Sequence, residues 1–538
     1  VGLHDIFFLL GGDSILASQA IAQSQRSVLY FSPRDLFQYS TVSQLATVVK
    51  SKAHSQVQQE PVVGVVPLTP IQHWFFSQDL INPHHWNQSI LLSVKQGLQP
   101  EILARSLQHL INHNDALRAT FHRTEQGWQQ RYKDPLESVP LEVVQCAVED
   151  AASAITAKAE DIQSSFRLDS GPLLKAVYYD LETTGGREQR LLLACHHLVI
   201  DGVSWRILLS DLQMLYQQLS QSPDRKDVAL LPPKTLSCRD WVSQLKGADF
   251  TAELPYWKRV ATASVATLPL DFSDGENKMS AASTISVSLS SSQTKELLKD
   301  VPAAYSIHVD ELLLTALALT LLPAMSSDQL AIRIFLESHG RSEDHDLSHT
   351  VGWLTSLYPV LLSISSKTGG SITNLSAAIK TVKETLRVVP NQGRGYGALR
   401  YLHPKTEKKP AVETDSPVRF NYLGQTDQLF AQSDWLAPAS ESTGPARSPQ
   451  DLRDVLLEIN AVVSRQQLTL YWTYSEALHK YDTIASWATS YLNHLTALIQ
   501  HCLSTDTDHG YSPTDFPQMD LEQGELDSLL ASLGGDVS

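Results

Sequence analysis

The chain has 538 residues, a net charge of −16 at pH 7 and a hydrophobic fraction of 42%. This length is sufficient for roughly two to four domains with full cores, and the composition is that of a globular protein rather than a disordered or fibrous one. The acidic excess argues against nucleic-acid binding, because a surface that binds phosphates needs positive charge.

The cysteines are scattered without a CxxC pair or a cysteine–histidine spacing typical of a metal site; they are Cys146, Cys195, Cys238 and Cys502. They predict neither structural zinc nor a disulfide framework, so we expect a reducing, cytoplasmic compartment. The apolar start contains Asp5 and lacks a basic segment, so it does not predict a signal peptide, and no later stretch is long enough to span a membrane. Because the chain does not begin with Met, we expect a piece of a longer polypeptide with domains on both sides.

Residues 1–50 are expected to form a small helical unit. The sequence GGDSI at 11–15 precedes apolar residues at the spacing of one helix face, and Ser14 occupies the N-cap position. By itself this pattern is typical of a loop that enters a capped helix. A hydroxyl exposed at a helix N-terminus and flanked by glycines is also accessible to a modifying enzyme, and the helix end favours a phosphodiester anion. The polar residues 51–65 predict a linker.

Residues 66–505 alternate between strand and helix patterns, which predicts an α/β domain. We expect two lobes, at about 66–245 and 246–505, joined around 246–258. Apolar residues at helical spacing predict a helix over 203–219, and period-two patterns at 455–459 and 468–474 predict sheet in the second lobe. Residues 506–538 are rich in Ser, Asp, Gly and Glu and are expected to form an exit linker.

The chemical centre of the sequence is the string HHLVIDGVSWR at 196–206, which follows an apolar run typical of a buried strand. Histidine suits proton transfer because its ordinary pKa lies near neutrality. Asp201 follows His197 by four residues and could help to fix one imidazole at the end of the strand. A pair such as His196 and His197 alone is more often a packed surface or core pair, so the dipeptide by itself does not predict catalysis.

Further strings lie along the rest of the domain: PLTPIQHWF at 67–75, IHVDELLL at 307–314, ESHGR at 337–341, VGWLTSLYP at 351–359, GRGYG at 393–397 and FNYLGQ at 420–425. Singly they are weak, since a glutamate such as Glu337 at a strand end is usually solvated or salt-bridged. The glycine-rich string is not a phosphate loop, because no Lys–Ser/Thr pair follows it. Their order and number carry the argument.

Together these strings resemble the condensation-domain superfamily of nonribosomal peptide synthetases, in which the double histidine begins an HHxxxDG motif. The SWR extension at 204–206, Glu337 and the pair Asn421 and Tyr422 resemble the epimerization branch of that superfamily. Ser338, where the family usually has Gly, and Leu354 depart from the pattern. Residues 1–50 resemble a peptidyl carrier domain whose first helix is missing, and Asp13 resembles the carrier subtype that precedes epimerization domains.

The resemblance implies a small all-α carrier domain followed by an α/β, two-lobed epimerization domain that resembles chloramphenicol acetyltransferase, V-shaped with a central tunnel. It implies 4'-phosphopantetheine attached covalently to Ser14. The implied partners are an upstream adenylation domain, a downstream condensation domain and a phosphopantetheinyl transferase, with no nucleic acid and no membrane. We expect a monomer within an assembly line for antibiotic-type secondary metabolites.

The implied reaction is inversion of the α-carbon, L to D, of an aminoacyl or peptidyl thioester. Inversion needs proton removal on one face and delivery on the other, so His197 and Glu337 are the expected pair, and either one could remove the L-proton. Tyr422, Asn421 or a backbone N–H could stabilise the developing charge. His196 is expected to orient, Asp201 to brace the histidine loop, and Arg341 to pair with Asp201 or Glu337. No metal is required.

Two alternatives remain open at this point. A condensation domain would use the same double histidine to form a peptide bond between two carrier-bound thioesters. A noncatalytic docking module of the same fold is the other alternative, suggested by the departures at Ser338 and Leu354. A scaffold has no physical need for both His197 and Glu337, which favours an enzyme.

Overall fold

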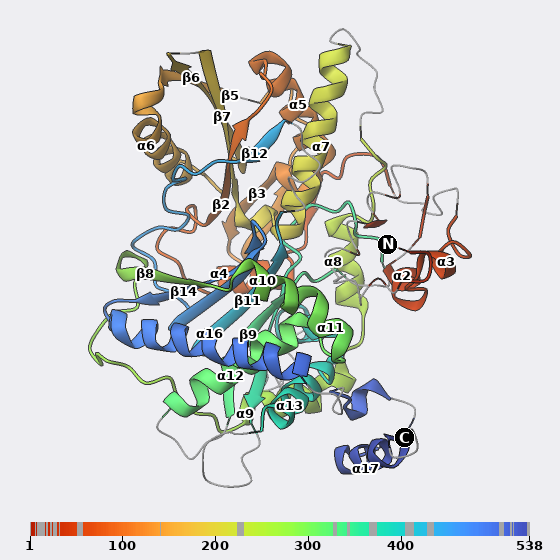
Figure 1. Cartoon of the computed structure of the whole chain (residues 1–538). Helices are drawn as coiled ribbons and strands as arrows, with labels where there is room; N and C mark the ends of the chain where they lie inside the picture. Colours follow the sequence, from red (N-terminus) through yellow and green to blue (C-terminus); the bar gives the residue numbers. More distant parts are fainter. Residues whose placement is uncertain are drawn as a thin grey trace.

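The computed structural model describes most of the chain, and residues 58–504 form two lobes (Figure 1). Within that range the description omits residues 140, 185, 223–230, 326–330, 342–344, 365–373, 404–413 and 428–434. Outside it, the structure describes residues 2–5, 7, 17, 20, 21, 24, 29–31, 33–50, 510–516, 519 and 521–534.

The first lobe contains a mixed sheet, whose described strands run in the order β12-β2-β7-β6-β5, and a smaller antiparallel sheet in the order β1-β4-β3. Its own strands are β1 (Gly64–Val66), β2 (Asn87–Val94), β3 (Ala119–Thr124), β4 (Gly127–Tyr132), β5 (Leu141–Ala147), β6 (Leu174–Thr183) and β7 (Gly186–His196). Its helices are α4 (Pro70–Phe76), α5 (Pro100–His113), α6 (Ala151–Ser164) and α7 (Gly202–Gln221). Residues 191–195 of β7 are fully buried, which explains their unbroken apolar run.

The second lobe contains a mixed sheet with described strands in the order β10-β9-β11-β13-β14-β8, in which β11 is parallel to both of its neighbours. These strands are β8 (Ala282–Ser288), β9 (Ala331–Ser338), β10 (Ser356–Ser363), β11 (Val418–Gln425), β13 (Leu457–Ser464) and β14 (Gln467–Ser475). The helices are α8 (Cys238–Gly247), α9 (Leu254–Thr262), α10 (Ser291–Lys295), α11 (Val301–Ala304), α12 (Val309–Ala324), α13 (Leu375–Arg387), α14 (Arg394–Gly397) and α16 (Tyr481–Ser504). The long α16 lies across the sheet (Figure 1) and contacts α12, which is apolar on all sides and therefore buried.

The structure places the lobe boundary differently from the expected division at 245. Cys238, Trp241 and Leu245 of α8 pack into the core of the second lobe, because their apolar face meets it. In addition, β12 (Leu436–Pro438), which comes late in the chain, pairs with β2 of the first lobe and covers its edge. The two lobes therefore exchange segments and do not divide at a single point.

The local predictions for the domain are confirmed. The helix expected at 203–219 is α7, which begins after Asp201 because the Asp201 carboxylate accepts a hydrogen bond from Ser204 N. The strands expected from alternation are β13 and β14. In the glycine-rich string, Gly393 has a φ of +82° and lies against the ring of Tyr358, where a Cβ would be 2.0 Å away. That string therefore serves close packing.

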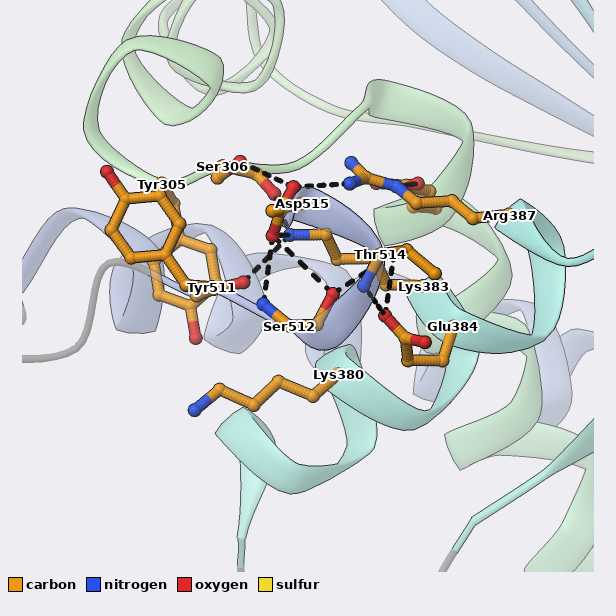
Figure 2. Close-up of polar contacts among 12 residues, drawn as sticks. Tyr305, Ser306, Lys380, Lys383, Glu384, Arg387, Tyr511, Ser512, Thr514 and Asp515 are labelled. Carbon is orange, nitrogen blue, oxygen red and sulfur yellow. Dashed lines mark hydrogen bonds and ion pairs between the residues drawn. The ribbon is translucent and has the colours of Figure 1, made fainter. Parts of the chain in front are cut away.

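The expected exit linker contains ordered structure. Residues 510–516 contact α13, and Figure 2 shows the polar cluster that holds them. The buried Lys383 Nζ donates to Asp515 Oδ2 at 2.6 Å, and Arg387 Nη1 donates to Asp515 Oδ1 at 2.5 Å. Glu384 accepts from the backbone N–H and the hydroxyl of Thr514. A helix, α17 (Gln523–Gly534), follows.

In the N-terminal segment the structure describes two short helices, α2 (Pro33–Gln38) and α3 (Val42–Leu45). Ser14 lies outside the described residues. Among the residues that are described, no helix combines the length and apolar character needed to cross a membrane.

Candidate active site

The double histidine lies where β7 of the first lobe ends. His196 is the last residue of β7, and His197 opens the turn η3 (His197–Val199) with its backbone N–H donating to Trp86 O at 2.9 Å. The next element, α7, starts from the Asp201 cap, whose carboxylate also accepts from the Ser204 hydroxyl at 2.7 Å. The chain therefore has little freedom on either side of His197.

The ring of His197 has a hydrogen bond on each nitrogen. Nδ1 donates to Ile200 O at 2.8 Å, and Nε2 accepts from the side-chain amide of Gln88 at 2.9 Å. Burial and the positive charge of Arg447 together lower the pKa of His197 to about 4, against Asp201 and two backbone hydrogen bonds that raise it. His197 is therefore neutral at pH 7, with its lone pair on Nε2.

His196 is fully buried and structural in its contacts. Its Nε2 donates to Pro83 O at 2.9 Å, and its Nδ1 accepts from Leu198 N at 3.2 Å. Burial lowers its pKa to about 3. Both ring nitrogens therefore have hydrogen-bond partners in the backbone.

Arg341 pairs with Asp201 rather than with Glu337. Its guanidinium donates from Nη1 to Asp201 Oδ2 at 2.8 Å and from Nη2 to Oδ1 at 3.1 Å, and the two side chains are about 5% exposed. Nη2 also donates to Thr350 O. Although burial raises the pKa of Asp201, Arg341 and Ser204 lower it below its ordinary value. This pair joins the histidine turn of the first lobe to the end of β9 in the second.

Glu337 is the second ionisable candidate and lies near the end of β9. Its carboxylate accepts from Asn421 Nδ2 at 3.2 Å and lies 3.7 Å from Arg419 Nε, and the side chain is 25% exposed. Burial raises the pKa of Glu337, and the negative charge of Glu458 raises it further, against Arg419 and Arg447, which lower it. Glu337 therefore holds a proton more readily than an ordinary glutamate.

Glu458 on β13 interacts electrostatically with three nearby arginine side chains. Burial raises its pKa, but Arg447, Arg419 and Arg453 together lower it to about 2. Arg419 also forms an ion pair with Asp454. The two carboxylates, Glu337 and Glu458, thus have pKa values pushed in opposite directions, which is how an acid–base site distinguishes two like groups.

Asn421 and Tyr422 lie on opposite faces of β11, because side chains alternate along a strand. Asn421 shares the face of Glu337, whereas Tyr422 shares the face of Phe420 and packs against the core of the second lobe. The structure therefore places Asn421 on the face of Glu337 and Tyr422 on the opposite face of β11.

Two tryptophan side chains, Trp353 and Trp74, form an aromatic ridge between His197 of the first lobe and Glu337 of the second. The Trp353 ring stacks on His197 with ring centres 4.1 Å apart, and Trp74 of α4 meets Trp353 edge-on at 6.2 Å. The Arg419 guanidinium lies 5.2 Å from the centre of the Trp74 ring and also beside Glu337. A cavity next to this ridge is lined by residues from both lobes, including Trp74 and Leu357, the residue that pairs with Glu337 across β9 and β10.

Four residues of this site were missed in the sequence: Gln88, Arg419, Arg447 and Glu458. Arg419 and Asn421 could have been grouped with Glu337 from the period-two alternation of their strand. Gln88 carried no signal of its own, because a polar residue at the start of a strand is ordinary.

Comparisons with known proteins agree with this geometry. Residues 62–519 match the family described as condensation domain, and residues 1–49 match the phosphopantetheine attachment site family, whose cofactor is 4'-phosphopantetheine. The epimerization domain from the third module of tyrocidine synthetase B is 33% identical with a TM-score of 0.75, covering 84% of this chain and 99% of that one.

Among curated relatives, one of the linear gramicidin synthase proteins of Brevibacillus parabrevis is 39% identical over 541 residues, which is 98% of this chain and 10% of that protein. Surfactin synthase subunit 1 of Bacillus subtilis (strain 168) is 37% identical over 98% of this chain and 15% of that protein. The chain thus spans only about a tenth of the length of the first of these relatives. The chain belongs to the condensation-domain family of nonribosomal peptide synthetases, and a phosphopantetheine attachment segment precedes its two-lobed domain.

Proposed function

We propose that the two-lobed domain epimerizes the α-carbon, L to D, of an aminoacyl or peptidyl thioester, and that the domain is an isomerase. The observation that supports the proposal is a row of contacts between the lobes, in which Trp353 stacks on the neutral His197 and Trp74 links Trp353 to Arg419. Arg419 lies beside Glu337, whose pKa is raised. Inversion requires one proton-transfer group on each face of the carbon, and His197 and Glu337 are two groups of suitable pKa on opposing lobes.

The roles follow from the contacts. His197 would take or give a proton at Nε2 once the substrate has displaced the Gln88 amide from that nitrogen, and Glu337 would do the opposite through its carboxylate. Asn421 or a backbone N–H would stabilise charge on the thioester oxygen. His196, Asp201 and Arg341 would hold the histidine turn in place.

The 4'-phosphopantetheine, attached at Ser14, would present the acyl group as a thioester, which makes its Cα–H more acidic than that of an ester or amide. We propose residues 1–50 as the carrier, 51–65 as a linker and 66–505 as the epimerization domain. In the longer protein, an adenylation domain would precede this chain and a condensation domain would follow it, with a phosphopantetheinyl transferase as a transient partner. We propose that the chain acts as a monomer.

Peptide-bond formation is the second candidate, because the matched family is described as condensation domain and the double histidine is common to both reactions. A condensation reaction needs one base beside an acceptor amine, so it would not need Glu337. The requirement for Glu337 therefore separates the two candidates.

Deuterium exchange at the α-carbon tests the proposal. The chain would be loaded at Ser14 with several aminoacyl-phosphopantetheines, incubated in D₂O, hydrolysed and analysed by chiral chromatography with mass detection. Deuterium uptake with an L/D mixture, lost in His197→Ala and in Glu337→Gln, is the expected result. Peptide formed with an added acceptor thioester, without exchange, would support condensation, and no reaction with any substrate would favour a noncatalytic docking module.

A further inference from the structure

The side-chain amide of Gln88 lies between two groups of the first lobe that come from other elements. Gln88 is on β2, opposite Cys195 of β7, and its amide reaches both His197 and Trp205 of α7. Its Oε1 accepts from the Trp205 indole N–H at 2.9 Å, and its Nε2 donates to His197 Nε2 at 2.9 Å. Both ends of one amide are therefore used.

The hydrogen bonds from Trp205 through Gln88 to His197 form a relay, and the chemistry of Trp205 fixes which group donates in each of them. An indole N–H is only a donor, so the amide oxygen must face Trp205 and the amide NH₂ must face His197. At its other nitrogen, His197 donates to a carbonyl oxygen, that of Ile200, which can only accept. Both hydrogen bonds thus require the proton on Nδ1 and the lone pair on Nε2.

We propose that Gln88, held by Trp205, is a positioning residue that keeps the resting His197 neutral and in the Nδ1–H tautomer. The proposal rests on the proposed epimerization. When Nε2 takes a proton, its new N–H points at the Gln88 NH₂, so two donors face one another. The amide cannot turn without leaving the buried Trp205 N–H without an acceptor. The protonated ring is therefore disfavoured.

The other groups around His197 affect the charge of its ring but do not determine which nitrogen carries the proton. Arg447 disfavours and Asp201 favours a positive charge on the ring, Trp353 stacks on its face, and the neighbouring His196 is neutral and held by backbone groups. None of these groups distinguishes Nδ1 from Nε2 by a hydrogen bond. That distinction comes from Gln88 at Nε2 and from the backbone, whose Ile200 O accepts from Nδ1.

Two substitutions test the relay from opposite sides. Gln88→Glu keeps the shape but offers an oxygen to each partner, so it accepts from Trp205 and from a protonated Nε2. Trp205→Phe removes the indole N–H and frees the Gln88 amide to turn its oxygen toward His197. Gln145→Glu, which adds a carboxylate at an exposed position on β5, is the matched charge control.

The readout is NMR titration of ¹³Cε1-histidine-labelled protein, with the His197 signal assigned from His197→Gln. The expected result is a rise of the His197 titration midpoint by about 1–3 pH units in Gln88→Glu, since an opposite charge at hydrogen-bond distance shifts a pKa by that amount. A smaller rise is expected in Trp205→Phe, and none in Gln145→Glu. The acidic limb of the pH profile of Cα–H exchange should move with the midpoint.

Unchanged midpoints in both Gln88→Glu and Trp205→Phe would overturn the proposal, and either variant suffices if the other does not fold. Because the titration needs no substrate, it is independent of the reaction. A wild-type protein without Cα–H exchange but with the expected midpoint shifts would overturn the proposed function and leave the role of Gln88 in place.

Discussion

Arg341 and Asp201 form a two-point ion pair between the lobes, with N···O distances of 2.8 and 3.1 Å. Asp201 also caps α7 and accepts from Ser204, so one buried carboxylate receives hydrogen bonds from an Arg, a Ser and the backbone. The pair therefore fixes the histidine turn against the segment after β9. Loss of this ion pair should lower both the free energy of unfolding and the rate of catalysis.

Arg341→Met should destabilise the protein by about 3–5 kcal/mol, because it leaves the buried Asp201 charge without its partner. Arg341→Lys should recover only part of this loss, since an ammonium cannot reproduce the two-point geometry. Urea unfolding followed by circular dichroism measures the difference. Lys278→Ala, which removes an ion pair with Glu276 in which both side chains are exposed, is the control and should cost about 1 kcal/mol or less. Equal losses in Arg341→Met and Lys278→Ala would contradict the assignment.

Glu337→Gln should lower the rate of Cα–H exchange by about 10²–10⁴-fold, the usual contribution of a general acid or base, with little change in stability because the amide keeps the shape. The measurement is single-turnover deuterium uptake on loaded carrier. Glu182→Gln, at an exposed position on β6, is the matched control and should leave the rate unchanged. A Glu337→Gln protein with the wild-type rate would remove Glu337 from the mechanism.

Glu458→Gln should lower the pKa of Glu337. It removes the negative charge that raises this pKa, and it leaves Arg419 and Arg447 to act on Glu337 without a competing carboxylate. The limb of the exchange-rate profile that reports Glu337 should therefore move to lower pH, and its position is read from rates measured between pH 4 and 9. A limb at its wild-type pH in a folded Glu458→Gln protein would show that Glu458 does not act on Glu337.

The sequence predicted those site residues that belong to short motifs, and it missed those that strand pairing brings into the site. His197, Asp201 and Arg341 belong to short strings whose order is diagnostic, and Asn421 follows from its string as well. Gln88 binds His197, which lies about 110 residues later in the sequence, and Glu458 raises the pKa of Glu337, which lies about 120 residues earlier. Neither Gln88 nor Glu458 belongs to a recognisable local sequence pattern. Such partners are set by strand register, which one sequence does not reveal.

The fold shows the same limit. Helix α7 and strands β13 and β14 follow from periodicity, whereas the pairing of β12 with β2 of the other lobe joins residues more than 340 positions apart. Tyr422 shows a different limit, because its string places it next to Asn421 in the sequence, whereas alternation places the two side chains on opposite faces of β11. Periodicity therefore predicted elements well, and their partners poorly.

Stability should fall as the pH drops from about 6.5 to 4. Burial lowers the pKa of His113, His197 and His339 to about 4 and that of His196 to about 3. The folded pKa of each is below that of the unfolded chain, so the stability is fully present above pH 6.5 and is lost as protons bind the unfolded state. The expected slope is about 1.4 kcal/mol per pH unit for each histidine.

Urea unfolding at pH 7.5, 6.0 and 5.0 measures this loss. His113→Gln should reduce the dependence of the unfolding free energy on pH by about 1.4 kcal/mol per pH unit, the contribution of one histidine. The control is His122→Gln, at an exposed position on β3, which should leave this dependence as in the wild type. The low pKa of His113 comes mainly from burial, with smaller contributions from Lys234 and His349. A His113→Gln slope equal to that of the wild type would contradict the assignment for this residue.

Asp515→Asn should release the segment 510–516 from α13. Asp515 is the carboxylate that pairs with both Lys383 and Arg387 (Figure 2), and without it the fully buried Lys383 ammonium keeps only backbone carbonyls as acceptors. Because an unpaired buried charge costs about 3–5 kcal/mol, a segment this short should open rather than bear that cost. Hydrogen exchange of residues 510–516 and of α17 should become faster, while β9 and β11 keep their protection.

Lys380→Ala is the control for that experiment, since it removes an ion pair between Lys380 and the half-exposed Asp527 on α17 and should cost about 1 kcal/mol or less. It should therefore speed exchange in α17 slightly and leave residues 510–516 protected. Protection of residues 510–516 that is equal in Asp515→Asn and in the wild type would mean that apolar contacts, such as that of Gly510 with the Tyr305 ring, hold the segment instead of the buried charges.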